Sequence, residues 1–159
     1  MKKTLIAFIS LFLIYWIATM VVPGIIEKKG NPVKTLPPYK VSAEAQALFN
    51  SLVFVADLHC DALLWGRDLT KKSESGHVDF PRMQEGNAAM QVFTIVSKSP
   101  KGQNMEVNSE NATDNITLLN IAQGRPVSNW FSLMKRTLYQ SGKLEEFSDN
   151  FNGEFIFIK

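Results

Sequence analysis

The segment Leu52-Val53-Phe54-Val55-Ala56-Asp57-Leu58-His59-Cys60-Asp61 carries most of the information about the fold. Its first half is a continuous apolar run, which is typical of a strand buried on both faces in a parallel sheet. Alternate side chains of an extended segment share a face, so we expect His59 and Asp61 to point together and Cys60 to point away. Because sites in open sheets and barrels lie at the C-terminal ends of strands, this imidazole and carboxylate predict half of a zinc shell.

The same residues also have interpretations without a metal. Asp57 or Asp61 could cap the following turn, and His59 could be a packed or an exposed imidazole. Asp57 could instead be an acceptor that orients His59. Cys60 is the chain's one cysteine, so no intrachain disulfide can form, and its predicted direction favours burial over zinc binding.

Downstream residues predict helices that alternate with strands. Asp79 is expected to cap a short helix with Pro81 in its first turn, and Gly86 to end it. Residues 89–96 predict a second buried strand and residues 154–158 a third. Such alternation indicates an α/β fold with parallel strands.

Two further helices are expected between these strands. Asp114 is predicted to cap the first, which carries Ile116, Leu119 and Ala122. The second has an apolar stripe at helical spacing, which we interpret as core packing; its residues are Phe131, Met134 and Leu138.

The N-terminus predicts a single transmembrane helix. Residues 4–26 carry no charge, and about 20 such residues span the hydrocarbon core of a bilayer. The run is longer than the ~7–15 apolar residues of a cleaved signal peptide and lacks its small-residue end, so residues 1–26 are interpreted as an anchor, with a signal sequence as the alternative. Lysines on both sides leave the orientation undecided by the positive-inside rule.

The remaining chain divides into two parts. Residues 27–48 are rich in proline and are expected to form a membrane-proximal spacer, ending in a short helix that Ser42 caps. Residues 49–159 form the domain proper. The 17 Lys and Arg nearly balance the 15 Asp and Glu, which argues against nucleic-acid binding.

Several of these motifs together resemble the renal (membrane) dipeptidase family of zinc metallopeptidases. The resemblance rests on the Asp57-to-Asp61 motif and on the segments His77-Val78-Asp79-Phe80-Pro81-Arg82-Met83, Gly86, Gln91-Val92-Phe93 and Phe155-to-Ile158. It covers nearly all of the chain after the anchor. It implies a (β/α)₈ TIM-type barrel, of which residues 49–159 are the N-terminal part, since such a barrel takes about 250 residues.

The resemblance also implies an activity and its ligands. His59 and Asp61 would bind the first of two zinc ions, while a bridging glutamate and two histidines would come from later strands. The paired metals would hydrolyse dipeptides. The family also implies a membrane-tethered, extracytoplasmic enzyme and is compatible with a homodimer.

The chain departs from the family pattern in the rest of the ligand set. His77 is its one other histidine and falls in a loop, so we do not expect it to bind metal, and Glu154 is misplaced for the bridging role. We therefore expect this polypeptide to be an inactive part of the enzyme, with uncovered apolar faces. Two other interpretations remain: a metal amidohydrolase of another small amide, and a non-enzymatic single-pass membrane protein.

Overall fold

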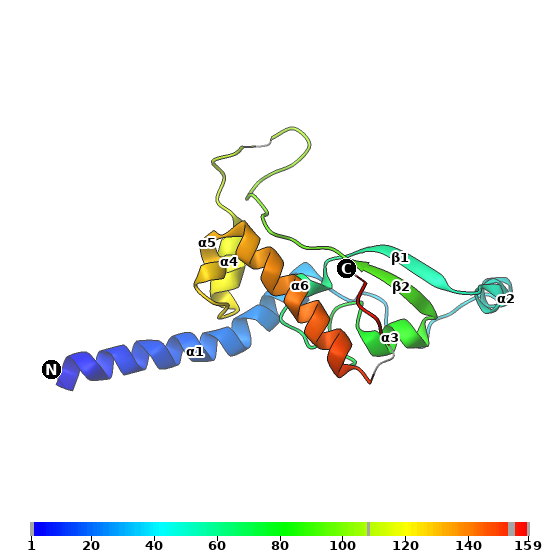
Figure 1. The fold of residues 1–159 in the computed structure, drawn as a ribbon, viewed down its shortest axis with the longest axis horizontal. Coiled ribbons are helices and arrows are strands. Elements are labelled where there is room, and N and C mark those ends of the chain that lie inside the picture. Colours follow the sequence, from blue (N-terminus) through cyan, green and yellow to red (C-terminus); the bar gives the residue numbers. More distant parts are fainter. Residues whose placement is uncertain (1, 108, 153–154, 159) are drawn as a thin grey trace.

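The computed structural model describes residues 2–107, 109–152 and 155–158, which form a mixed helix and sheet structure (Figure 1). Its elements, in chain order, are α1 (Lys2–Gly30), α2 (Ala43–Ser51), β1 (Val55–Cys60), the 3₁₀ helix η1 (Ala62–Leu64), α3 (Phe80–Glu85), β2 (Ala88–Phe93), α4 (Asn115–Ala122), α5 (Ser128–Phe131) and α6 (Leu133–Asn150).

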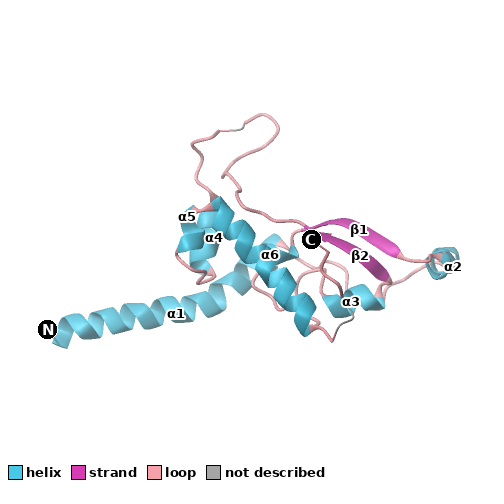
Figure 2. Cartoon of the chain, viewed as in Figure 1, coloured by secondary structure: helices cyan, strands magenta, loops and turns pink. Residues whose placement is uncertain are grey.

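The two strands pair in parallel, as the alternating pattern predicts (Figure 2). Val55 pairs with Ala88 at one end of the ladder and Cys60 with Phe93 at the other. The connection between the strands contains η1 and α3. The α/β prediction is therefore confirmed at the level of a helix-connected, two-stranded parallel sheet.

Among the described residues, the sheet is covered on one face only. Cys60 and Phe80 belong to a core cluster on the covered face, against which α6 packs Leu144 and Phe147. On the strands themselves Leu58, Met90 and Val92 are exposed. The prediction of strands buried on both faces is thus wrong for this structure, whereas the expectation of uncovered apolar faces is confirmed.

The apolar run also begins before the strand that it predicts. β1 starts at Val55, and the preceding Val53 and Phe54 are 89% and 56% exposed. The pairing explains the shift, because the first ladder partner of β2 is Val55 and nothing in the described sheet pairs with residues 52–54.

The C-terminal segment joins the core through side chains. The Phe155 ring stacks on Phe80 with 4.4 Å between centroids, and the Ser148 hydroxyl donates to the Phe155 carbonyl at 3.0 Å. Residues 155–158 have no strand conformation, so the predicted third strand is wrong over them. Glu154 lies outside the described residues.

The apolar stripe expected in the core is instead exposed. Phe131, Met134 and Leu138 are 78%, 71% and 58% exposed, and Phe131 ends α5, because Ser132 caps a new helix through the Lys135 N–H. The opposite side of α6 buries Arg136, whose guanidinium bonds to the Asn129 carbonyl at 2.7 Å and to Asp114 at 2.5 Å. These hydrogen bonds allow a cation to occupy the position where apolar side chains were expected.

The other predicted helix starts are confirmed by their capping bonds. Ser42 accepts from the Ala45 N–H, Asp79 from the Arg82 N–H and Asp114 from the Ile116 N–H. Gly86 ends α3, as predicted.

The N-terminal helix is long and apolar enough to cross a membrane, and its most apolar stretch is unburied in the structure. A signal sequence near an N-terminus would have the same properties. The helix does not stop at residue 26 but runs on to Gly30. Within this extension Glu27 is buried and pairs with Arg67 at 2.6 Å, so the first turn of the expected spacer contacts the domain.

Candidate metal site

His59 and Asp61 meet at the C-terminal end of β1. His59 is the penultimate residue of the strand, and Asp61 follows its last residue directly. The imidazole Nε2 lies 3.6 Å from Asp61 Oδ1, while the intervening Cys60 is buried in the core. The predicted sharing of one face by these two side chains, with Cys60 on the other, is confirmed.

The separation of the two candidate ligands fits a single zinc ion. Two ligand atoms about 2.1 Å from a tetrahedral zinc lie ~3.4 Å apart, close to the observed 3.6 Å between His59 Nε2 and Asp61 Oδ1. The two side chains are 72% and 47% exposed, so both are accessible from solvent.

A third residue, Thr94, holds the Asp61 carboxylate. Its hydroxyl donates to Asp61 Oδ1, and its backbone N–H donates to the Cys60 carbonyl at 2.9 Å. Thr94 was not predicted from the sequence. The register of the parallel strands could have identified it. Cys60 pairs with Phe93, so the residues that follow them, Asp61 and Thr94, must be neighbours.

Asp57 supports the backbone of β1. Its Oδ1 accepts the His59 backbone N–H at 3.2 Å, and the structure shows no bond from Asp57 to the imidazole. This hydrogen bond and one from the Gln91 side chain lower the pKa of Asp57 below its usual value. Of the roles considered for Asp57, local backbone capping is therefore the one observed.

The other candidate ligands lie apart from this pair. Burial raises the pKa of the Cys60 thiol, which disfavours the thiolate that zinc requires. His77 is exposed and lines a shallow cavity of about 390 Å³ with Lys34, Tyr39 and Arg82 among its neighbours. Within the described ranges, no three His, Cys, Asp or Glu side chains lie close enough together to hold a metal.

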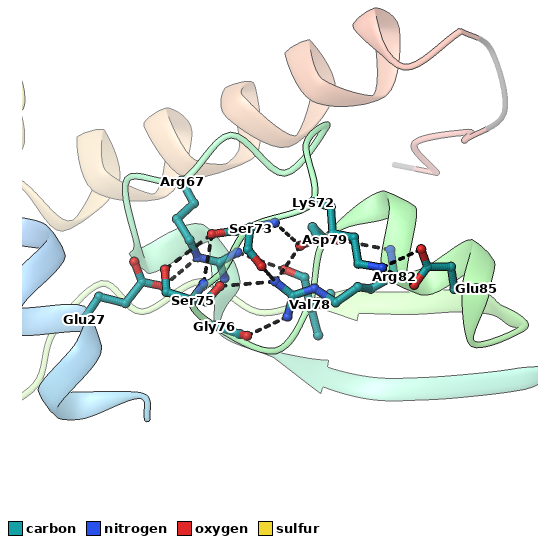
Figure 3. Close-up of polar contacts among 10 residues, drawn as sticks. All are labelled: Glu27, Arg67, Lys72, Ser73, Ser75, Gly76, Val78, Asp79, Arg82 and Glu85. Carbon is teal, nitrogen blue, oxygen red and sulfur yellow. Dashed lines mark hydrogen bonds and ion pairs between the residues drawn. The ribbon is translucent and has the colours of Figure 1, made fainter. Parts of the chain in front are cut away.

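The loop that follows the site is ordered by a buried acid and an arginine (Figure 3). Asp79 is fully buried; its Oδ2 accepts the Ser73 N–H at 3.1 Å and pairs with Arg82 at 2.9 Å. Arg82 in turn donates to the Gly76 carbonyl at 2.6 Å. The Asp79-to-Arg82 part of the quoted motif thus has a structural role, because it folds the loop between η1 and α3.

Comparisons of the chain with protein-family models, with curated proteins and with solved structures gave no match. The function proposed below is inferred from the sequence motifs and from the geometry of His59, Asp61 and Thr94.

Proposed function

We propose that this protein contributes the first-strand half of a two-zinc site in a membrane-anchored dipeptidase of the renal dipeptidase type. The observation that carries the proposal is the 3.6 Å approach of His59 Nε2 and Asp61 Oδ1 on the solvent-facing side of a strand end. The motif order along the chain supports the substrate class by resemblance.

Each residue of the site has a distinct role in this proposal. His59 and Asp61 would bind the first zinc, and Thr94 would fix the Asp61 carboxylate through the hydrogen bond to Oδ1. Asp57 keeps the backbone of His59 in place. The bound metals would supply hydroxide at neutral pH and polarise the scissile carbonyl of the dipeptide.

Two protein ligands are fewer than the three or four that zinc takes in proteins. By resemblance, a bridging glutamate and two histidines on later barrel strands would complete the site. We therefore propose that the polypeptide of residues 1–159 is inactive by itself and that turnover requires these additional ligands.

Zinc binding tests the half-site directly. We expect the purified protein to bind zinc weakly in equilibrium dialysis, because it supplies two ligands, and His59→Ala or Asp61→Ala to abolish this binding. Thr94→Val, which removes an outer-shell partner, should weaken the binding without abolishing it. The matched control is His77→Ala, which removes the other histidine. Equal zinc retention in His59→Ala and His77→Ala would refute the site.

Activity is tested with protein expressed from the full coding sequence. We expect zinc-dependent release of amino acids from dipeptides, and its loss in Asp61→Ala. Hydrolysis of cyclic amides without hydrolysis of dipeptides would instead identify an amidohydrolase. Activity that survives both metal removal and Asp61→Ala would contradict any metal-dependent function of this pair.

We also propose that α1 anchors the domain on the extracytoplasmic side, with Lys2 and Lys3 in the cytosol. The length and apolar composition of α1 support an anchor, and the family resemblance supports the side. Protease added to intact cells should digest the domain, and digestion only after lysis would reverse the orientation.

A further inference from the structure

The apolar helix α1 contacts the domain along about half of its length. The Tyr15 hydroxyl donates to the Ile121 carbonyl at the end of α4, at 3.0 Å. One turn later, the Thr19 methyl group lies 3.2 Å from the position that a Cβ on Gly124 would occupy. Gly124 has φ +62°, a conformation that favours glycine. Because glycine has no side chain, the backbone of the turn after α4 lies directly against α1.

These contacts limit how deeply α1 alone can enter a bilayer. The part of the helix before them, Thr4 to Ile14, rises about 16 Å at ~1.5 Å per residue, whereas the hydrocarbon core is ~30 Å thick. A docked α1 therefore spans the core only if the part of the domain beside Tyr15 also enters the membrane. Helices that lie in the membrane interface insert ~5–10 Å into it. The rest of the hydrocarbon thickness is a few ångströms, much of which Lys2 and Lys3 can span by extending their side chains to the lipid headgroups.

The surface beside these contacts is apolar. Leu118 precedes Ile121 by one turn of α4 and is 58% exposed, and Val127, just past Gly124, is 65% exposed. Phe131 at the end of α5 is also exposed. Figure 1 shows α4 and α5 on the side of the domain from which α1 extends. These residues, together with the turn at Gly124, form what we call the α4–α5 corner.

Several polar groups of the corner are bonded within the protein, which lowers the cost of their burial in lipid, whereas Asn129 Nδ2 in α5 is buried without a partner. The Asn120 amide donates to the Ile116 carbonyl at 2.7 Å, and the Trp130 indole N–H donates to the Arg125 carbonyl at 2.9 Å. The Arg125 guanidinium lies 4.3 Å from the centre of the Tyr139 ring. The corner thus combines exposed apolar side chains with Asn120 and Trp130 side chains that are bonded within the protein.

We propose that the α4–α5 corner inserts into the membrane interface beside α1, so that the domain rests on the bilayer instead of being held away by residues 27–48. The buried Glu27–Arg67 pair would fix the angle between helix and domain. The inference rests on the proposed membrane anchor and is independent of zinc binding.

Fluorescent labelling in vesicles tests whether the α4–α5 corner inserts into the membrane interface. The full chain is reconstituted in phosphatidylcholine vesicles with some phosphatidylserine and a spin-labelled lipid as quencher. An environment-sensitive dye is placed on Leu118→Cys or Val127→Cys, with Val53→Cys as the matched exposed control and Phe12→Cys as the anchor control. Cys60 is buried, so the unsubstituted chain measures background labelling.

We expect blue-shifted emission and at least several-fold stronger lipid quenching at positions 118 and 127 than at position 53. Leu118→Lys should reduce the quenching at position 127, and Val53→Lys should leave it unchanged. The inference is overturned if position 12 is quenched while positions 118 and 127 behave like position 53. If position 12 is also unquenched, the anchor and this inference both fail, and zinc binding by His59 and Asp61 still decides the metal site.

Discussion

The two faces of the β1–β2 sheet differ in how completely this chain covers them. On the covered face, Phe80 is 2% exposed and its ring contacts Phe93, Phe151 and Phe155. On the open face, Met90 and Val92 are 45% and 42% exposed although both lie within β2. The open face and the proposed zinc ligands His59 and Asp61 thus belong to the same region of β1 and β2.

The largest expected effect tests the covered face against an exposed phenylalanine. Phe80→Ala should lower the free energy of unfolding by about 3–5 kcal/mol, because it removes a fully buried ring. The matched control Phe131→Ala, at a position 78% exposed, should change it by less than about 0.5 kcal/mol. Urea unfolding followed by tryptophan fluorescence measures both. Similar losses in the two variants would mean that burial of the Phe80 ring on the covered face adds no more stability than an exposed phenylalanine does.

A smaller effect is expected at the ion pair that orders the loop beneath the covered face. Asp79→Ala should cost about 3 kcal/mol, the low end for breaking a buried pair, because the Arg82 side chain is still 23% exposed. Lys72→Ala breaks the exposed Lys72–Glu85 pair and should cost at most about 1 kcal/mol. Limited proteolysis of the loop over residues 65–78 gives a second measurement. Equal costs would show that the loop does not depend on Asp79.

The smallest effect is a dependence of stability on acid, located at the buried side of α6. Burial raises the pKa of Asp114, but hydrogen bonds from the Ser99 N–H and the Arg136 guanidinium outweigh it and lower the pKa below 3.8. A depressed pKa contributes stability at neutral pH that is lost as pH falls through the lowered value. Asp114→Asn should therefore flatten the fall in unfolding midpoint at acid pH. An unchanged acid profile would mean that Asp114 titrates alike in both states.

Local features were predictable because they depend on near neighbours in sequence. Ser42, Asp79 and Asp114 each accept from a backbone N–H two or three residues ahead, which residue type and position suffice to predict. The alternation of His59, Cys60 and Asp61 follows in the same way from strand geometry. The candidate site could be predicted to that extent.

Features that depend on contacts between distant segments were not predictable. The stripe of Phe131, Met134 and Leu138 has helical periodicity, but periodicity does not reveal which side of a helix meets the core. That side is determined by Arg136, whose partners include the Ser97 carbonyl, 39 residues earlier, and Asp114, 22 residues earlier. Thr94 was missed for the same reason, because the strand register brings it to Asp61.

Residue chemistry and local backbone geometry suffice to predict the apolar N-terminal helix, the helix caps, the two parallel strands and the shared face of His59 and Asp61. Packing between distant segments, by contrast, covers one face of the sheet, places the Thr94 hydroxyl on Asp61, and brings α1 against the domain through Tyr15 and Glu27. These contacts join residues that lie far apart in the sequence, and local sequence patterns do not reveal such contacts.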